Sequence, residues 1–229
     1  MIFLLKINGL LVMDIIGKII LENKKIEQVS KDFNVVEAGL EKNNLDNIEK
    51  TLNMLRNSGL SIYAVHTPHI TVDEIEYFKK AETVAKEFNA LLVFHSNKLP
   101  ITYYLKIIDI LTYDKVSIET NPGISINAIE NFILKKGKKF CLDIAHLYIS
   151  SDTNFYSDLK YLVDKYKNQI NHIHISDSTK FEDNLPVGEG EIDFKKVMNI
   201  IRICNCKAVI EVMPKHQKDG RDKILSYMK

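Results

Sequence analysis

The sequence has no excess of charge of either sign, which bears on whether nucleic acid is a general partner. Its 31 Lys and Arg residues nearly balance 30 Asp and Glu residues, and the formal net charge is +1. A nucleic-acid-binding face needs a basic patch, whereas the lysines here are mixed with acidic residues along predicted helices. A general electrostatic attraction to DNA or RNA is therefore excluded. Tryptophan is also missing, and its absence carries no functional information.

Cysteine is scarce and long apolar runs are absent. The three cysteines, Cys141, Cys204 and Cys206, are an odd number at no metal-binding spacing, which is typical of reduced thiols in a cytoplasmic protein. No apolar run approaches the ~20 residues of a membrane span, so we expect no membrane association. The apolar residues 1–5 lack the basic segment and cleavage site of a signal peptide, and we interpret them as part of a first strand.

Strand-like and helix-like segments alternate along the chain. In residues 72–88, for example, Ile75, Phe78, Val84 and Phe88 recur at helical spacing. Such alternation predicts βαβ units, and eight units predict an α/β fold of the (β/α)₈ TIM-barrel type. No linker divides the chain, so we expect a single domain over residues 1–229. The expected strands lie near residues 2–8, 34–38, 61–66, 91–95, 115–119, 139–143, 170–174 and 207–211, and the expected helices near 45–58, 72–88, 102–111, 126–135, 156–166 and 194–203.

Four side chains able to bind a metal stand at or just past the ends of apolar runs: Glu119, Asp143, His174 and Glu211. In a barrel the C-terminal ends of all strands meet at one face, so we expect these side chains to converge there. Three carboxylates with an imidazole suit a hard-to-borderline divalent cation. The alternative is that they are polar strand ends paired with loop amides. It is disfavoured because buried carboxylates without a cation or partner are costly.

Three more histidines extend this set. His66 and His95 also end apolar runs, and they could either hold a second metal or bind substrate. His146 follows Asp143 by three residues, where a contact to a substrate hydroxyl or phosphate is as reasonable as a metal bond. The sequence leaves these alternatives open.

The segment after His174 offers further candidates. Lys180 lies on the expected loop over the barrel mouth, where it could bind a substrate phosphate or carboxylate, or be an ordinary surface lysine. Gly188-Glu-Gly190 predicts a tight turn, and Asp193 predicts the N-cap of the next helix. We expect His172 to point away from the ligand face, toward a helix.

Seven short pieces, in their order along the chain, resemble one known group of proteins. The pieces are Val65-His-Thr-Pro68, Val93-Phe-His95, Ile118-Glu-Thr-Asn-Pro-Gly123, Leu142-Asp-Ile-Ala-His146, His172-Ile-His-Ile-Ser-Asp177, Leu185-Pro-Val-Gly-Glu-Gly-Glu-Ile-Asp-Phe194 and Val209-Ile-Glu211. With these pieces the chain resembles the xylose isomerase-like TIM barrel superfamily, which contains sugar isomerases and epimerases and also the endonuclease IV group (AP endonuclease family 2).

The resemblance implies roles for particular residues. The principal metal would be bound by Glu119, Asp143, His174 and Glu211, and the two glutamates would act as acid and base. In the endonuclease members, His66 and His95 would join Glu119 around a second metal. A third metal would use His146 and an Asp-x-His tripeptide, but this chain has Glu182-Asp-Asn184 there, so we expect no third metal.

The first functional hypothesis is a divalent-metal-dependent isomerase or epimerase of a sugar, sugar phosphate or related hydroxy-carbonyl compound. It would transfer a proton through an enediolate, with one Zn²⁺, Mn²⁺, Mg²⁺ or Co²⁺ ion. The alternative is an endonuclease IV-like zinc phosphoesterase acting on abasic-site DNA with two or more ions. A sugar-binding barrel without turnover comes third. The expected partner is thus a small carbohydrate, with nucleic acid only under the alternative, and homo-oligomer formation stays open.

Overall fold

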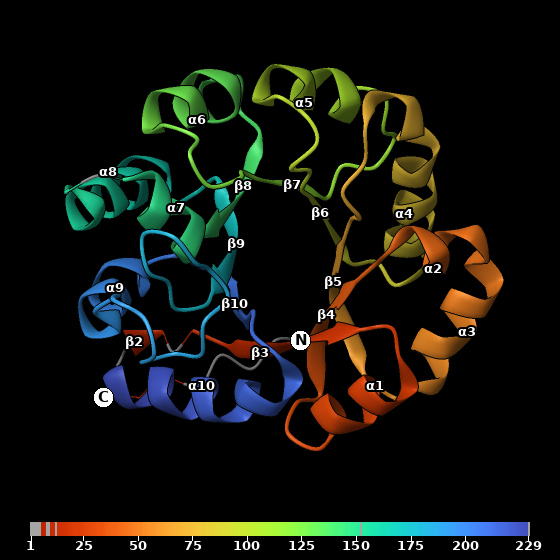
Figure 1. Cartoon of the computed structure of the whole chain (residues 1–229), viewed down its shortest axis with the longest axis horizontal. Helices are drawn as coiled ribbons and strands as arrows, with labels where there is room; N and C mark the ends of the chain where they lie inside the picture. Colours follow the sequence, from red (N-terminus) through yellow and green to blue (C-terminus); the bar gives the residue numbers. More distant parts are fainter. Residues whose placement is uncertain (1–5, 8–9, 12, 152, 229) are drawn as a thin grey trace.

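Eight parallel strands close into a barrel, with helices around the outside (Figure 1). The computed structural model describes every residue except 1–5, 8–9, 12, 152 and 229. The strands follow one another around the barrel in chain order, and β10 closes it against β3. The predicted TIM-barrel fold is confirmed. The barrel strands are β3 (Ile15–Ile20), β4 (Val35–Gly39), β5 (Ser61–His66), β6 (Leu91–Phe94), β7 (Val116–Glu119), β8 (Lys139–Asp143), β9 (Ile170–Ile175) and β10 (Lys207–Ile210).

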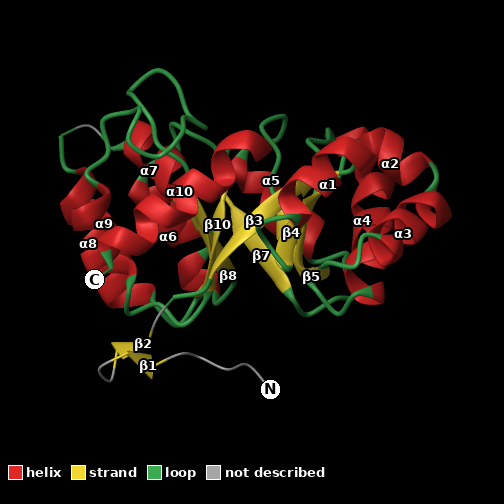
Figure 2. Cartoon of the chain, turned by 90° about the horizontal axis from the view of Figure 1, so that it is seen from below, coloured by secondary structure: helices red, strands yellow, loops and turns green. Residues whose placement is uncertain are grey.

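The first barrel strand does not lie at the predicted residues 2–8. Of the expected strand at residues 2–8, only Lys6–Ile7 is described, and it forms β1, antiparallel to β2 (Leu10–Leu11). This hairpin lies outside the barrel (Figure 2). The barrel instead begins with β3, within the mostly apolar residues 10–20. A strand that packs on both faces reads as an almost continuous apolar run, which hides the alternation expected of a half-exposed strand.

Helices cover the outer face of the strands. Asp193 caps α9 as predicted, accepting a hydrogen bond from the backbone N–H of Lys196 at 3.2 Å. Helices α1, α7 and α10 had not been predicted. No described helix is long and apolar enough to cross a membrane. The helices are α1 (Asn23–Ser30), α2 (Lys42–Asp46), α3 (Ile48–Asn57), α4 (Ile75–Glu87), α5 (Ile101–Ile108), α6 (Ile126–Phe132), α7 (Ile144–Ser150), α8 (Phe155–Tyr166), α9 (Phe194–Ile201) and α10 (Pro214–Tyr227), with short 3₁₀ turns at Val72–Glu74 and Leu134–Lys136.

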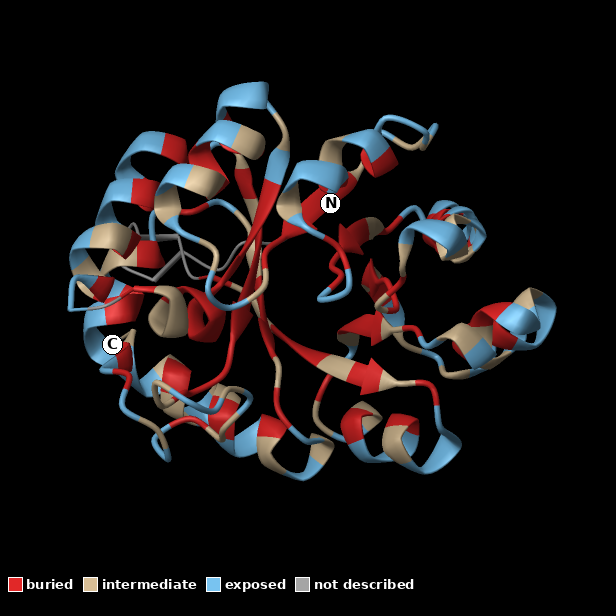
Figure 3. Ribbon diagram, turned by 45° about the horizontal axis from the view of Figure 1, so that its top comes forward, coloured by how far each residue is buried: buried red, intermediate tan, exposed pale blue. Residues whose placement is uncertain are grey.

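The two faces of the strands differ in chemistry. Their outer faces pack against the helices in one large apolar cluster, and Figure 3 shows that the strands are mostly buried. Inside the barrel lies a small apolar cluster built on Ala64, Val93 and Cys141. Toward the C-terminal ends, the buried side chains become charged or polar, with Glu37, Glu119 and His174 almost fully inaccessible to solvent. Burial of so many ionisable groups requires that each has a partner.

Candidate metal centre

The four residues expected to converge do converge. One ligand atom from each of Glu119, Asp143, His174 and Glu211 lies within 4.8 Å of the others. The Nδ1 atom of His174 is the centre of the group. It lies 2.7 Å from Oε2 of Glu211, 3.2 Å from Oε2 of Glu119 and 3.7 Å from Oδ2 of Asp143. The strand ends of β7, β8 and β9, together with the residue after β10, thus deliver one compact donor set.

Asp143 has two tasks. Its Oδ1 atom caps α7 by accepting the backbone N–H of His146 at 2.7 Å. Its Oδ2 atom faces Nδ1 of His174. Because the cap holds one oxygen, the carboxylate presents the other toward the centre.

The donor set passes a test for a cation. Nδ1 of His174 and Oε2 of Glu211 are both buried, and neither makes a hydrogen bond within the described residues. Burial lowers the pKa of His174, but the side chain of Cys141 and the carboxylates of Glu211, Glu37 and Glu119 outweigh it and hold the pKa well above its usual value. A proton or a metal ion must therefore offset these carboxylates. Mutual distances below 4.8 Å fit ligands about 2.0–2.6 Å from one ion.

Glu37 on β4 lies next to Nε2 of His174, on the side of the ring opposite to the central donor set. Its Oε2 atom accepts hydrogen bonds from Nε2 of His174 at 3.1 Å and from Nε2 of His172 at 2.7 Å. The prediction that His172 points away from the ligand face, toward a helix, was therefore wrong. Side chains two residues apart on a strand point to the same side, so His172 follows His174 into the barrel. There its ring stacks on Tyr63, with 5.6 Å between ring centres.

Lys18 on β3 closes a ring of four side chains, formed by Lys18, Glu37, His174 and Glu211. Its ammonium group is 3.0 Å from Oε1 of Glu37 and contacts Oε1 of Glu211, so each carboxylate gives Oε1 to the lysine and Oε2 to His174. Burial lowers the pKa of Lys18, but the nearby carboxylates raise it above its ordinary value, and the lysine is charged. The side chain of Gln217 on α10 fixes this strand by bonding the backbone N–H and carbonyl of Lys18 at 3.0 and 2.7 Å.

A second donor set shares Glu119. Nε2 of His66 lies 3.1 Å from Oε2 of Glu119, and Nδ1 of His95 lies 3.4 Å from Oε1. The opposite nitrogen of His66 donates to the carbonyl of Thr67 at 2.9 Å. The structure therefore brings both histidines to the same carboxylate.

The proton position on His95 follows from its neighbour. The amide nitrogen of Asn121 donates to the carbonyl of Ser96 at 2.8 Å and to the hydroxyl of Tyr104 at 3.0 Å, so its oxygen must face His95. That oxygen is 2.6 Å from Nε2 of His95, which therefore carries the proton. Burial lowers the pKa of His95, which keeps the ring neutral. The lone pair of Nδ1 then faces the Glu119 carboxylate, an arrangement that a cation between them would stabilise.

His146 belongs to the same network. Its Nδ1 atom donates to the carbonyl of Thr120 at 2.8 Å and lies 3.2 Å from Oε1 of Glu119. Its Nε2 atom lies 3.3 Å from Oδ2 of Asp183. Asn184 stands where the third-metal histidine would be, and within the described residues His146 and Asp183 do not form part of any group of three or more metal-ligand side chains.

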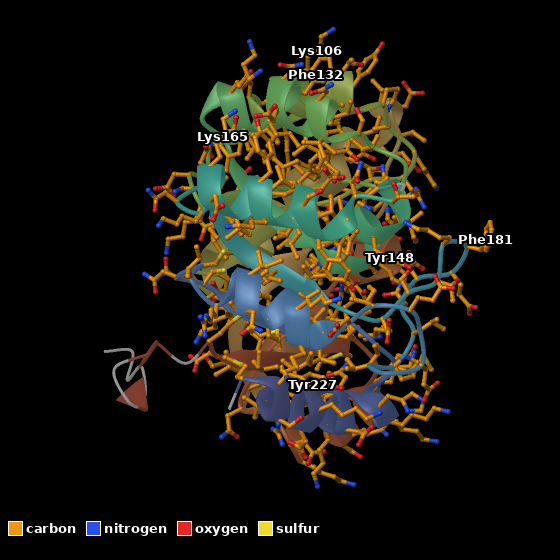
Figure 4. The ribbon with its side chains drawn as sticks, turned by 90° about the vertical axis from the view of Figure 1, so that its left-hand side faces the viewer. Lys106, Phe132, Tyr148, Lys165, Phe181 and Tyr227 are labelled. Atoms are coloured by element: carbon orange, nitrogen blue, oxygen red, sulfur yellow. The ribbon has the colours of Figure 1, made fainter. Side chains whose placement is uncertain are left out.

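The loop after β9 carries Asp183 and is held by one buried carboxylate. Asp177 accepts backbone N–H groups from Ser178 at 2.8 Å, Gly188 at 2.8 Å and Ile192 at 3.1 Å. A Cβ atom at Gly190 would come within 2.5 Å of the carbonyl oxygen of Ser178, so only glycine fits there. The glycine turn is thus a structural turn, as predicted. Phe181 projects into solvent from this loop, 98% exposed (Figure 4).

Lys180 is placed apart from the other candidates. Its ammonium group donates to the backbone carbonyls of Tyr148, at 2.6 Å, and Ser151, and it lies over the ring of Tyr148. These contacts tie the loop to α7 and occupy the ammonium group. The geometry therefore gives Lys180 a structural role and does not support the expected contact with substrate.

A pocket of about 830 Å³ opens above the donor sets. Its volume falls in the range of small-molecule sites, about 300–1,000 Å³. Among its lining residues are Lys18, His66, His95, His146, Asp183 and Glu211. Lys18, Glu37, Asn121 and Asp183 had not been singled out from the sequence. For the first two a signal existed, because each is a charged residue inside an otherwise apolar run.

The family comparison agrees with the motifs. Residues 115–225 match the family described as xylose isomerase-like TIM barrel, and this range contains all four members of the central donor set. The resemblance inferred from the sequence is confirmed. A comparison with curated proteins finds no match.

Solved structures with the same fold span different activities. A xylose isomerase domain protein from Planctomyces limnophilus aligns with a TM-score of 0.69 at 13% identity, covering 95% of this chain and 97% of its own. A Thermus thermophilus protein soaked with ZnCl₂ gives 0.74 at 17% identity, covering 94% and 98%. An AP endonuclease, family 2, from Brucella melitensis gives 0.62 at 15%, covering 94% and 99%. At these identities the likeness establishes the fold, and the reaction has to be argued from the site.

Proposed function

We propose that the protein is a divalent-metal-dependent isomerase or epimerase of a small hydroxy-carbonyl compound such as a sugar or sugar phosphate. The observation that carries the proposal is the pair of carboxylates, Glu119 and Glu211, that meet at Nδ1 of His174 beneath a pocket of small-molecule size. They come from β7 and from the end of β10, on either side of β9 around the barrel. A substrate carbon held between them would have a carboxylate on each face.

The metal would be held by Glu119, Asp143, His174 and Glu211. When bound, a divalent ion polarises a carbonyl oxygen and stabilises the negative charge that develops when the neighbouring C–H bond breaks. The chain's own residues move the proton. Burial raises the pKa of Glu211, but His174 and Lys18 outweigh it and hold the pKa well below its usual range, so Glu211 is ionised and able to accept a proton.

Proton return completes the reaction. One carboxylate takes the proton from the carbon next to the carbonyl, and the electrons of that bond form the enediolate. The other carboxylate, or the same one, returns a proton to carbon, with no net oxidation of the substrate. Return to the opposite face of the carbon gives an epimer. Return to the adjacent carbon gives an isomer, provided that the proton of the neighbouring hydroxyl group also moves to the former carbonyl oxygen.

Proton exchange with solvent tests this proposal. Metal-loaded protein would be incubated in D₂O with a panel of ketoses, ketose phosphates and hydroxypyruvate, and deuterium at carbon would be followed by NMR. We expect incorporation into at least one compound, reduced about 10²–10⁴-fold by Glu211→Gln or Glu119→Gln. Asp14→Asn at the opposite end of the barrel is the matched control and retains full exchange. Absence of exchange with every compound would contradict the proposal.

A second candidate has one specific observation in its favour. The neutral His95, with its Nδ1 lone pair directed at Glu119, supports a second metal next to the first. Two adjacent ions suit the hydrolysis of a phosphodiester. Metal analysis and a nuclease assay distinguish the candidates: one ion per chain with carbon–deuterium exchange supports the isomerase, and two ions with metal-dependent nicking of abasic-site DNA support the phosphoesterase.

A further inference from the structure

We infer that Glu37 is a positioning residue of the metal centre: it fixes which nitrogen of His174 carries the proton and so directs the other nitrogen at the metal. The inference rests on the metal centre proposed above and is independent of the reaction catalysed. Glu37 is not among the residues that line the pocket, and it bonds directly to His174, so it acts on the metal centre without contacting a substrate.

The geometry leaves one arrangement of protons on His174. An ionised carboxylate can only accept hydrogen bonds, so the nitrogen 3.1 Å from Glu37 must be a donor. That nitrogen is Nε2, and Nδ1 therefore offers its lone pair to any cation that replaces the proton facing Glu119, Asp143 and Glu211. Hydrogen bonds of this kind orient metal-binding histidines and raise their basicity.

Glu37 is itself held in place. Nε2 of His172 donates to Oε2 of Glu37 at 2.7 Å, the oxygen that also accepts from His174, and the ammonium group of Lys18 lies 3.0 Å from Oε1. Two hydrogen-bond donors from β9 and one ammonium group from β3 therefore surround one fully buried carboxylate. With both oxygens engaged, the carboxylate has no freedom to turn away from His174.

Replacing the carboxylate by an amide disturbs the centre in two ways that act in the same direction. In Glu37→Gln, the amide can present its N–H₂ group to Nε2 of His174, which favours the tautomer with a proton on Nδ1. That proton points at the position the metal would occupy. The substitution also removes one negative charge close to the cation. Both effects weaken metal binding, and changes at partners of metal-binding histidines cost about 10–100-fold in affinity.

The experiment measures Zn²⁺ affinity by competition with a chromophoric chelator. We expect Glu37→Gln to raise the Kd for Zn²⁺ by about 10–100-fold. Glu130→Gln is the matched control, because Glu130 is also buried and also receives three donors, from Tyr161, Lys165 and Tyr166, but lies between α6 and α8. The control should melt earlier with an unchanged Kd.

A second measurement needs no variant. In Zn²⁺-loaded wild-type protein with ¹⁵N-labelled histidine, long-range ¹H–¹⁵N NMR should show His174 coordinated through Nδ1 and protonated at Nε2. Coordination through Nε2, or a Kd for Glu37→Gln within twofold of wild type, would overturn the inference and leave the metal centre standing. A wild-type protein that binds no Zn²⁺ would overturn both. If Glu37→Gln does not fold, the NMR result decides alone.

Discussion

Lys18 offers a direct test of the charge balance in the barrel. Lys18→Met keeps the length and apolar stem of the side chain and removes the cation that contacts Glu37 and Glu211. Both carboxylates then lose a partner in a site where Glu37 is fully buried. Removing one member of a buried ion pair costs about 3–5 kcal/mol. Because the lysine side chain is 14% exposed, we expect the lower end, about 3 kcal/mol.

The assay is thermal unfolding of chelator-treated protein, with and without added divalent metal. A loss of about 3 kcal/mol lowers the Tm of a chain this long by roughly 6–12 °C. Metal should raise the Tm of Lys18→Met more than that of wild type, because a divalent ion replaces the missing charge and no longer meets repulsion from the ammonium group. An ion at 100 times its Kd contributes about 2.7 kcal/mol.

The matched control is Lys207→Met. Lys207 pairs with Asp14 at the other end of the barrel, where Asp14 is 43% exposed, and such pairs contribute about 0–1 kcal/mol. The reasoning is refuted if Lys18→Met melts within about 2 °C of wild type in chelator, a shift of about 1 kcal/mol or less. It is equally refuted if metal stabilises the variant less than the wild type.

Three further outcomes follow from the same contacts. In a metal titration, Glu211→Gln should weaken metal binding by more than the ~100-fold expected of a change at a partner of a metal-binding histidine. Circular dichroism should still show a cooperative melting curve for the variant in chelator. Lys165 and Tyr166 lower the pKa of Glu130 from 4.5 to about 2, so the stabilisation by this carboxylate is complete above pH 4.5 and is lost as the pH falls toward 2. In denaturant unfolding, Glu130→Gln should therefore be less stable than wild type by about 1–3 kcal/mol at pH 7 and about as stable as wild type at pH 2. Gly190→Ala should cost about 1–3 kcal/mol by forcing a Cβ atom against Ser178, and a variant as stable as wild type in urea would contradict the described loop.

The strand-end residues of the site could be predicted from the sequence because position and chemistry coincide there. Glu119, Asp143 and His174 each close an apolar run, and parallel strands bring such ends to one face. Lys18 and Glu37 lie inside their strands. A charged residue within an apolar run is a signal, but it does not tell which face of the strand the side chain occupies, and therefore whether it points into the barrel. The first strand was misplaced for a related reason, since β3 is apolar almost throughout.

Loop contacts were the other limit. Asp183 meets His146, and Lys180 turns back to α7, because of the path that the chain takes between β9 and α9. That path is set by Asp177, whose carboxylate bonds to amides as far away as Ile192, and no local pattern encodes it. His172 was a different case, because the two-residue period of a strand already places it on the same face as His174.

The anchoring of this loop by Asp177 has a consequence for how such a barrel can diversify. The carboxylate bonds to both ends of the loop, at Ser178 and at Gly188 and Ile192, so the residues between these ends form a loop whose base is fixed independently of its tip. Its tip, which includes Phe181 and Asp183, can be lengthened, shortened or exchanged without disturbing a barrel strand. Descendants of this chain could therefore acquire new ligand preferences by loop replacement, provided that Asp177 and Gly190 are retained.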